Sequence, residues 1–131
     1  MTGAPTIILL ADDERHIRTL VRMTLGDVQN AIVEATDGAA AVELAERTTP
    51  ALIIIDQMMP RMNGRDAVAR MRAMPHLARV PIIMLTANDD AASEAQARVA
   101  GVDSYLLKPF SPLELLATVD GYLGAAREEA S

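Results

Sequence analysis

The chain contains no cysteine and no tryptophan, and only three of its 131 residues are aromatic. The absence of cysteine excludes disulfides and thiolate metal sites. Because aromatic side chains are so scarce, the core has to be built from aliphatic side chains and methionine. No apolar run approaches the roughly 18 residues that a membrane span requires.

The N-terminal segment, residues 1–5, has neither a basic stretch nor a long apolar one, so no signal peptide is expected. The net charge of −6 argues against a nucleic-acid-binding surface, which would need basic patches. The length fits one domain, residues 1–131, with a core over about 5–124 and a frayed tail over 125–131. We therefore expect a soluble cytoplasmic domain without a membrane span.

Lysine is nearly absent too. Lys108 is the only one, whereas eleven arginines carry the remaining positive charge. It directly follows an apolar run and precedes Pro109. A compact ammonium group where arginine is otherwise the rule indicates that a point charge is needed at this position.

Short apolar runs alternate along the chain with segments of helical period. Runs without polar alternation are typical of parallel strands covered on both faces, and they occupy residues 6–10, 31–35, 52–55, 82–85 and 104–107. Four stripes of helical spacing lie between or after them, at Ile17, Leu20, Val21 and Leu25; at Ala41, Val42, Leu44 and Ala45; at Val68, Met71 and Met74; and at Leu113, Leu116, Val119 and Leu123. The alanine-rich segment 90–100 should form the least firmly packed helix. Five such repeats predict a doubly wound α/β sandwich.

Several helix boundaries carry recognisable end signals. Asp37 is expected to cap the second helix, and Asn63-Gly64 to form the turn into the third. The segment Ser111-Pro112-Leu113-Glu114 has the pattern of a capping box. Gly26 and Gly101 are predicted to end helices, as residues that tolerate positive φ.

Polar side chains follow four of the five apolar runs: Asp12 and Asp13, then Asp56, Thr86 and Lys108. Open parallel sheets bind ligands beyond the carboxyl ends of their strands, so these side chains should face one crevice. Three carboxylates so close together would raise at least one pKa unless a cation intervenes, and oxygen ligands suit Mg²⁺. A metal, a lysine and a hydroxyl around one carboxylate are what an incoming phosphoryl group requires. The pattern predicts an aspartyl-phosphate site.

Each of these residues has a plainer interpretation when taken alone. Asp12 and Asp13 are good caps for a first helix, and Asp56 is a good turn residue. Thr86 fits an ordinary helix entry, and Lys108 fits a solvated charge. Only the joint placement of all five at strand ends favours a site.

With these motifs in order, the sequence resembles the receiver domains of two-component response regulators from Ile7 to about Leu123. The motifs that carry the resemblance are Asp12-Asp13-Glu14, Asp56-Gln57-Met58-Met59-Pro60 with Asn63-Gly64, Thr86-Ala87, and Lys108-Pro109-Phe110. The resemblance implies a flavodoxin-like (βα)5 three-layer sandwich whose parallel strands have the order 2-1-3-4-5.

It also implies roles for the site residues. Asp56 would be the phosphoacceptor and Lys108 would pair with the phosphoryl group. Asp12, Asp13, Asp56 and the backbone carbonyl of Met58 would hold Mg²⁺, with Mn²⁺ as a substitute ion. The peptide bond between Lys108 and Pro109 is expected to be cis.

The implied reaction is a phosphoryl transfer to Asp56 from a phosphohistidine on a sensor histidine kinase or a histidine phosphotransfer domain. The domain would catalyse its own phosphorylation and slow dephosphorylation rather than act on another substrate. Thr86 would then bond a phosphoryl oxygen, and Tyr105 would turn inward as a switch. The fourth helix, fifth strand and fifth helix would present a changed surface to a downstream protein, as a monomer or a phosphorylation-promoted dimer.

The chain departs from the family pattern at a few positions. Gln57 and Arg65 stand where apolar residues are usual, and both are expected to lie outside the chemistry, with Arg65 marking a partner-specific surface. Met58 and Asn88 flank the path of the hydrolytic water. Since neither is acidic, we expect a long-lived phosphoryl group, and a half-life as short as that of the fast chemotaxis regulators would contradict this.

Rival classes fit less well. A flavodoxin-type FMN binder would meet repulsion from Asp12-Asp13-Glu14, and a haloacid-dehalogenase-like phosphatase needs an aspartate where Met58 stands. A phosphorylation-independent pseudo-receiver that only binds proteins stays open as an alternative. A DNA-binding regulator would need an output domain, and none follows Ser131. A stand-alone receiver, a phosphorelay shuttle and a receiver fragment of a larger regulator or hybrid kinase all stay open.

Overall fold

The computed structural model describes residues 6–27, 29–88 and 90–130, with side chains up to residue 124. Its strands are β1 (Thr6–Ala11), β2 (Asn30–Ala35), β3 (Leu52–Asp56), β4 (Ile82–Thr86) and β5 (Ser104–Leu107). They form one parallel sheet in the order β2-β1-β3-β4-β5, which confirms the expected topology. Residue 5 and Ser131, the predicted limits of the core and the tail, lie outside the described residues.

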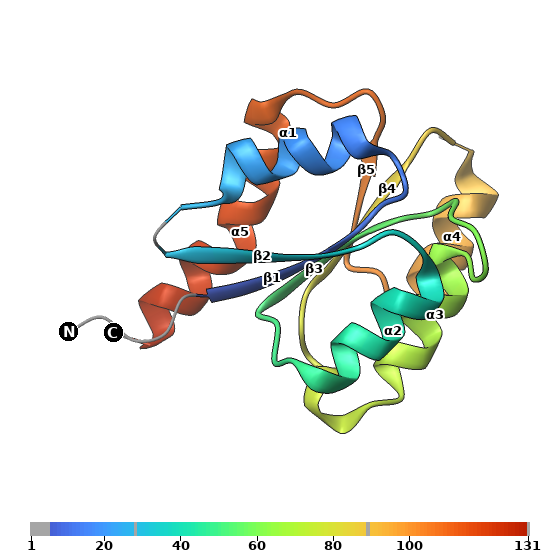
Figure 1. Ribbon diagram of the computed structural model, residues 1–131, viewed down its shortest axis with the longest axis horizontal. Helices are drawn as coiled ribbons and strands as arrows, with labels where there is room; N and C mark the ends of the chain where they lie inside the picture. The colour runs from blue at the N-terminus through green and yellow to red at the C-terminus, as the bar shows by residue number, and fades with distance from the viewer. Residues whose placement is uncertain (1–5, 28, 89, 131) are drawn as a thin grey trace.

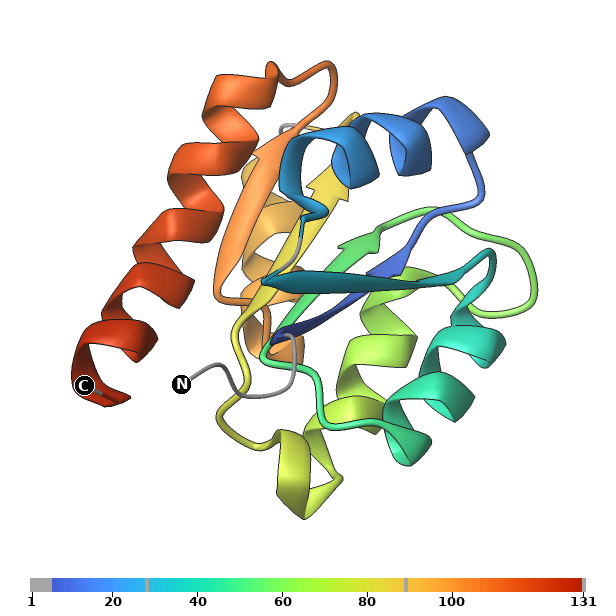
Figure 2. The same cartoon turned by 60° about the vertical axis from the view of Figure 1, so that its left-hand side comes forward.

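Helices cover both faces of the sheet (Figures 1 and 2). They are α1 (Arg15–Leu25), α2 (Gly38–Arg47), α3 (Gly64–Arg72), α4 (Ala91–Ala100) and α5 (Pro112–Ala130), with a 3₁₀ turn at Pro75–Leu77. One face packs against α1 and α5, and the other against α2, α3 and α4. None of the helices in the described part of the chain has the length and apolar character needed to cross a membrane.

Alternate strand residues supply two separate aliphatic cores, because successive side chains in a strand point to opposite faces. The core beneath α1 and α5 contains Ile8, Leu10, Ile54, Ile83 and Leu85 among its fully buried members. The core beneath α2, α3 and α4 contains Leu9, Ile53, Ile55, Ile82 and Met84. Both faces of the sheet are therefore packed against helices, and this packing fixes the backbone that carries the side chains at its carboxyl-terminal edge.

The expected helix caps are present. The Asp37 carboxylate accepts a hydrogen bond from the Ala40 N–H at 2.7 Å, and the Asn63 side chain accepts one from the Asp66 N–H at 2.8 Å. At the start of α5 the capping box forms in both directions: the Glu114 N–H donates to Ser111 Oγ at 3.1 Å, and the Ser111 N–H donates to Glu114 Oε1 at 3.3 Å.

The two predicted helix-ending glycines differ. Gly101 has a φ of 122°, as expected. Gly26 also ends its helix as predicted, but with a φ of −74°, so the tolerance of glycine for positive φ is not used there. The physical reason for glycine at this position is space: a Cβ on Gly26 would lie 2.7 Å from the Arg22 carbonyl oxygen.

The predicted apolar stripe of α5 was partly wrong. Leu115, Val119 and Leu123 face the core, whereas Leu113 is 78% exposed and Leu116 is 38% exposed. Leucines at 113, 115 and 116 allow more than one row of helical spacing, and the row at intervals of four residues is the one the sheet covers. Helix α5 extends to Ala130, and the fraying of the tail stays a prediction.

Helix α4 is the most weakly anchored helix of this face, as its composition suggested. Ala97 is its only buried residue among those described. Val99, on the outer side, is 89% exposed. Since so little apolar area fixes α4 to the sheet, a small change in the contacts at its ends can move it.

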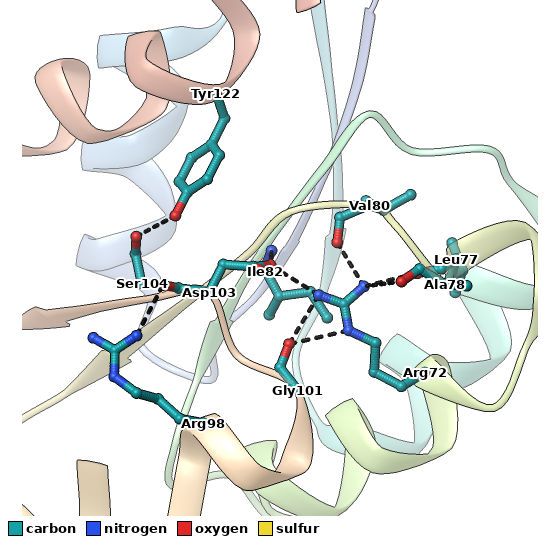
Figure 3. A network of polar contacts seen from close by, with 10 residues as sticks. All are labelled: Arg72, Leu77, Ala78, Val80, Ile82, Arg98, Gly101, Asp103, Ser104 and Tyr122. Carbon is teal, nitrogen blue, oxygen red and sulfur yellow. Dashed lines mark hydrogen bonds and ion pairs between the residues drawn. The ribbon is translucent and has the colours of Figure 1, made fainter. Parts of the chain in front are cut away.

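The end of α3 is tied to the α4–β5 connection by Arg72 (Figure 3). Its guanidinium donates to the carbonyl oxygens of Leu77 at 2.8 Å, Val80 at 2.7 Å and Gly101 at 2.8 and 3.0 Å. It also pairs with the Asp103 carboxylate at 2.8 Å. These contacts fix the amino-terminal ends of β4 and β5, at the edge of the sheet opposite the polar residues.

Arg72→Met is expected to destabilise the protein by about 2–4 kcal/mol, because several charge-assisted hydrogen bonds are lost and their acceptors remain part-buried. Urea unfolding measures the free energy of unfolding. Arg70→Met is the matched control, since Arg70 is an exposed arginine on the same helix. Equal stability of the two variants would contradict this assignment.

Candidate functional site

The carboxyl ends of β1, β3, β4 and β5 surround a polar pocket of about 280 Å³. It is lined by Asp13, Glu14, Asp56, Gln57, Met58, Thr86, Ala87 and Lys108. Asp12 is fully buried and contacts Lys108, one of the lining residues. The structure therefore brings together all five side chains that the sequence placed at strand ends.

Lys108 is the centre of the charges in this pocket. Its Nζ lies 3.1 Å from Asp12 Oδ2, 3.3 Å from Asp56 Oδ1 and 2.7 Å from Glu14 Oε1. Only 13% of its side chain is exposed. One ammonium group thus neutralises part of a cluster of carboxylates, so the interpretation of Lys108 as a solvated charge does not hold. The Lys108-Pro109 peptide bond that follows is cis.

The two carboxylate oxygens of Asp12 have different partners. Its Oδ1 accepts a hydrogen bond from the Glu14 N–H at 2.8 Å. Its Oδ2 forms an ion pair with Lys108 but accepts no hydrogen bond within the described part of the chain. The N-cap of α1 is Glu14, without a side-chain cap bond, so neither Asp12 nor Asp13 caps this helix. A carboxylate oxygen has more than one lone pair, so Oδ2 can contact Lys108 and still offer a ligand position to a cation.

The electrostatics of the pocket match this geometry. Burial raises the pKa of Asp56 to about 6, and the nearby charge of Asp12 adds to the effect while Lys108 opposes it. Burial likewise raises the pKa of Asp12. The hydrogen bond from Lys108 lowers the pKa of Glu14. Burial acts to lower the pKa of Lys108, but its bonds to Glu14 and Asp12 outweigh it, so that pKa is raised.

Four carboxylates can supply ligands to one ion. Asp12, Asp13, Glu14 and Asp56 each offer an oxygen, and these oxygens all lie within 4.8 Å of one another. A set of carboxylate oxygens without imidazole or thiolate suits Mg²⁺. The residues present therefore fit the ion that the sequence pattern implied.

The backbone around Asp56 is packed closely enough to fix its carboxylate. A Cβ on Gly64 would lie 2.1 Å from the Asp56 carbonyl oxygen, so only glycine permits α3 to begin there. The Gly64 N–H donates to the Gln57 carbonyl at 2.8 Å. The Met58 N–H bonds the Asp56 carboxylate, which favours its charged form, while the Met58 side chain is 72% exposed beside it.

Thr86 contacts Gln57, which the sequence placed outside the chemistry, and Asn88, which it placed beside the path of the hydrolytic water. Its hydroxyl donates to the side-chain oxygen of Gln57 and accepts a hydrogen bond from the Asn88 N–H at 3.0 Å. The expectation that Gln57 lies apart from the site was therefore wrong, because the side chain of Gln57 contacts a site hydroxyl directly.

Tyr105, the predicted switch residue, lies half-buried in β5 against the core beneath α2, α3 and α4. Its hydroxyl oxygen is buried and has no hydrogen-bond partner among the described residues. A buried hydroxyl without a hydrogen-bond partner costs free energy, so a position of the ring that gives the hydroxyl a partner would be favoured. The movement itself stays a prediction.

Two contributors to the site, Glu14 and Gln57, were not predicted. Glu14 stands next to the paired aspartates, and an acidic residue adjoining a metal motif was the available signal. Gln57 carried a weaker one: a polar side chain directly after an apolar strand and beside the candidate nucleophile. Neither contact could be read from spacing alone, because both depend on where a long side chain points.

The structure is a doubly wound parallel sheet with buried aspartates, a threonine and a lysine at its carboxyl edge. These are the features that the sequence pattern shares with receiver domains. Residues 8–120 match the response regulator receiver domain family, and the chain belongs to this family.

Known relatives agree with this membership. The transcriptional regulatory protein ResD of Bacillus subtilis (strain 168) is 40% identical over 123 residues, covering 94% of this chain and 50% of that protein. SrrA of Staphylococcus aureus (strain NCTC 8325 / PS 47) is 38% identical over 116 residues, covering 88% of this chain and 47% of that protein. The chain thus spans about half the length of these curated relatives.

Solved structures show the same fold. The chemotaxis protein CheY4 of Vibrio cholerae superposes with a TM-score of 0.85 at 32% identity, covering 91% of this chain and 99% of that one. The receiver domain of the sensor histidine kinase PA1611 from Pseudomonas aeruginosa PAO1 superposes with a TM-score of 0.84 at 33% identity, covering 92% and 99%. That receiver domain was crystallised with a magnesium ion coordinated in its active-site cleft.

Proposed function

We propose that this chain is a phosphoacceptor receiver of a two-component or phosphorelay system. In this role Asp56 accepts a phosphoryl group from a phosphohistidine on a sensor histidine kinase or a histidine phosphotransfer domain. The observation that carries the proposal is the placement of Asp56: its carboxylate is nearly buried, opens into the polar pocket, and lies 3.3 Å from Lys108 Nζ.

In the transfer step an Asp56 carboxylate oxygen attacks the phosphorus atom of the phosphohistidine. The new O–P bond forms as the N–P bond to the imidazole breaks, and the imidazole nitrogen keeps the electron pair. A pKa of about 6 leaves Asp56 largely ionised at neutral pH and makes it a stronger base than an ordinary aspartate. The Met58 N–H orients the carboxylate, and Lys108 neutralises charge on the phosphoryl oxygens.

Asp12, Asp13 and Asp56, with Glu14 beside them and the Met58 carbonyl as a further oxygen ligand, would hold Mg²⁺. When bound, the ion neutralises charge on the transferring phosphoryl group. Support comes from the four carboxylate oxygens, which lie within 4.8 Å of one another.

The face formed by α4, β5 and α5 is the proposed docking surface for the downstream protein. Exposed apolar side chains lie on two of these elements: Leu107 on β5, and Leu113 and Leu116 on α5. Ala97 is the only buried residue among those described in α4, and Thr86 connects to the start of this helix through Asn88. Phosphorylation of Asp56, with movement of Thr86 and Tyr105, would shift this face.

The proposal is tested by intact-mass spectrometry after incubation with Mg²⁺ and acetyl phosphate. Wild-type protein should gain one phosphoryl group, and the adduct should be absent from Asp56→Asn and from wild type in the presence of a chelator. Asp120→Asn, which changes an exposed aspartate of α5, should behave like wild type. No adduct on folded wild type, with acetyl phosphate or with a phosphohistidine donor, would favour a phosphorylation-independent binding domain.

A further inference from the structure

Gln57 and Thr86 are cross-strand neighbours at the edge of the pocket. Asp56 of β3 pairs with Leu85 of β4, and the Gln57 N–H continues the ladder by donating to the Leu85 carbonyl at 2.9 Å. The next pair along the two strands is therefore Gln57 and Thr86, whose side chains lie on the same face of the sheet. The pairing register of β3 and β4 therefore keeps these two side chains within hydrogen-bond reach of each other.

In this arrangement the single donor proton of the Thr86 hydroxyl is already used in a hydrogen bond. A hydroxyl donates one hydrogen bond, and the Thr86 hydroxyl donates it to the Gln57 side-chain oxygen. Its oxygen accepts from the Asn88 N–H at 3.0 Å. Thr86 is 1% exposed, so water cannot replace a lost partner easily. To donate to any other oxygen, the hydroxyl has to leave Gln57.

We propose that Gln57 is a positioning residue that holds the Thr86 hydroxyl in the unphosphorylated protein and competes for it with a phosphoryl oxygen on Asp56. The inference rests on the proposed function, since it names a competitor for the same hydroxyl. An apolar side chain at position 57 offers no acceptor. Gln57 would thus set how readily the phosphorylated state is reached.

The competition extends to the start of α4 through a chain of hydrogen bonds. The Asn88 side-chain amide donates to Ser93 Oγ at 3.1 Å. The Ser93 N–H in turn donates to the Asp90 carboxylate at 2.7 Å, which caps α4. When the Thr86 hydroxyl leaves Gln57, the Asn88 N–H that is bonded to this hydroxyl can move with it. The position of the start of α4 would then depend on whether Thr86 is bonded to Gln57.

Beryllofluoride, a stable mimic of the phosphoryl group, measures the competition at equilibrium in the presence of Mg²⁺. Gln57→Met keeps an unbranched side chain of similar length and removes the acceptor. Because a net hydrogen bond no longer has to be broken, this variant should bind beryllofluoride about 2- to 10-fold more tightly than wild type. Gln29→Met, which changes an exposed glutamine between α1 and β2, should bind like wild type.

A double-mutant cycle separates this effect from a general change in the pocket. In a Thr86→Val background, Gln57→Met should leave the beryllofluoride affinity unchanged, because no hydroxyl remains to be held. The ligand-free protein gives a second readout: three-bond couplings to the Thr86 methyl should report one χ1 rotamer in wild type and averaging between rotamers in Gln57→Met.

The outcomes separate the two proposals. Wild-type protein that binds no beryllofluoride overturns the proposed function itself. Wild-type binding with an unchanged affinity in Gln57→Met, an equal gain in the Thr86→Val background, or an unchanged Thr86 rotamer in Gln57→Met overturns the role of Gln57 alone. Tighter binding that requires Thr86, together with rotamer averaging, supports it.

Discussion

Replacing Lys108 with methionine is expected to slow phosphorylation of Asp56 by about 10²–10³-fold, the usual cost of removing one preorganised donor from a buried transition state. The Lys108 ammonium lies within 3.3 Å of both the Asp56 and Asp12 carboxylates, and no other lysine exists in the chain. Without it, negative phosphoryl oxygens would approach a cluster of carboxylates with less compensation. The measurement is the initial rate of adduct formation at saturating Mg²⁺ and fixed acetyl phosphate.

Two controls make the Lys108 result specific. Arg79→Met removes an exposed cation remote from the pocket and should leave the rate unchanged. Lys108→Arg keeps the charge but replaces a compact ammonium with a planar fork, and should stay well below wild type. A rate in Lys108→Met within a few-fold of wild type would remove Lys108 from the proposed chemistry.

Asp56→Asn is expected to stabilise the metal-free protein at pH 7.5 by about 2 kcal/mol, because ionising Asp56 in the folded state costs free energy. Burial, followed by the charge of Asp12, raises the pKa of Asp56 from 3.8 to about 6. Between these values the folded protein retains a proton that the unfolded chain has lost. Stability from this group is thus fully present below about pH 4 and is lost as the pH rises through about 6.

The pH dependence identifies the cause. Urea unfolding in chelator should show the advantage of Asp56→Asn at pH 7.5 and its disappearance toward pH 4. Lys108 stays paired with Asp12 and Glu14 in the variant, so no new uncompensated charge offsets the gain. Adding Mg²⁺ should stabilise wild type more than Asp56→Asn. A variant less stable than wild type at pH 7.5 in chelator would contradict the assignment.

The fold and the pocket could be predicted from the sequence largely because apolar runs and polar residues alternate so clearly. Asp56 and Thr86 are the last residues of β3 and β4, and Lys108 directly follows β5. In a parallel sheet these positions share one edge, so a pattern along the chain becomes a cluster in space. The strand order itself came from the resemblance, since periodicity does not specify which strands are neighbours.

What could not be predicted depends on side-chain direction and on competing rows of apolar residues. Leu113 and Leu116 were assigned to the core because their spacing allowed it, but the sheet covers the row through Leu115. Glu14 reaches Lys108 across 94 residues of sequence, a contact that no local pattern contains. The Gln57 contact with Thr86 was missed for the same reason, since it depends on the register between β3 and β4.

The most direct test of the account is to locate the phosphoryl group. Borohydride reduces an aspartyl phosphate to homoserine, so treatment of the phosphorylated protein followed by peptide mass spectrometry marks the modified residue. Homoserine at position 56 alone, formed only with Mg²⁺, is the expected result. Homoserine at Asp12 or Asp13, 5-hydroxynorvaline at Glu14, or neither product in a protein that carries the phosphoryl mass, would contradict the role of Asp56 as the phosphoacceptor.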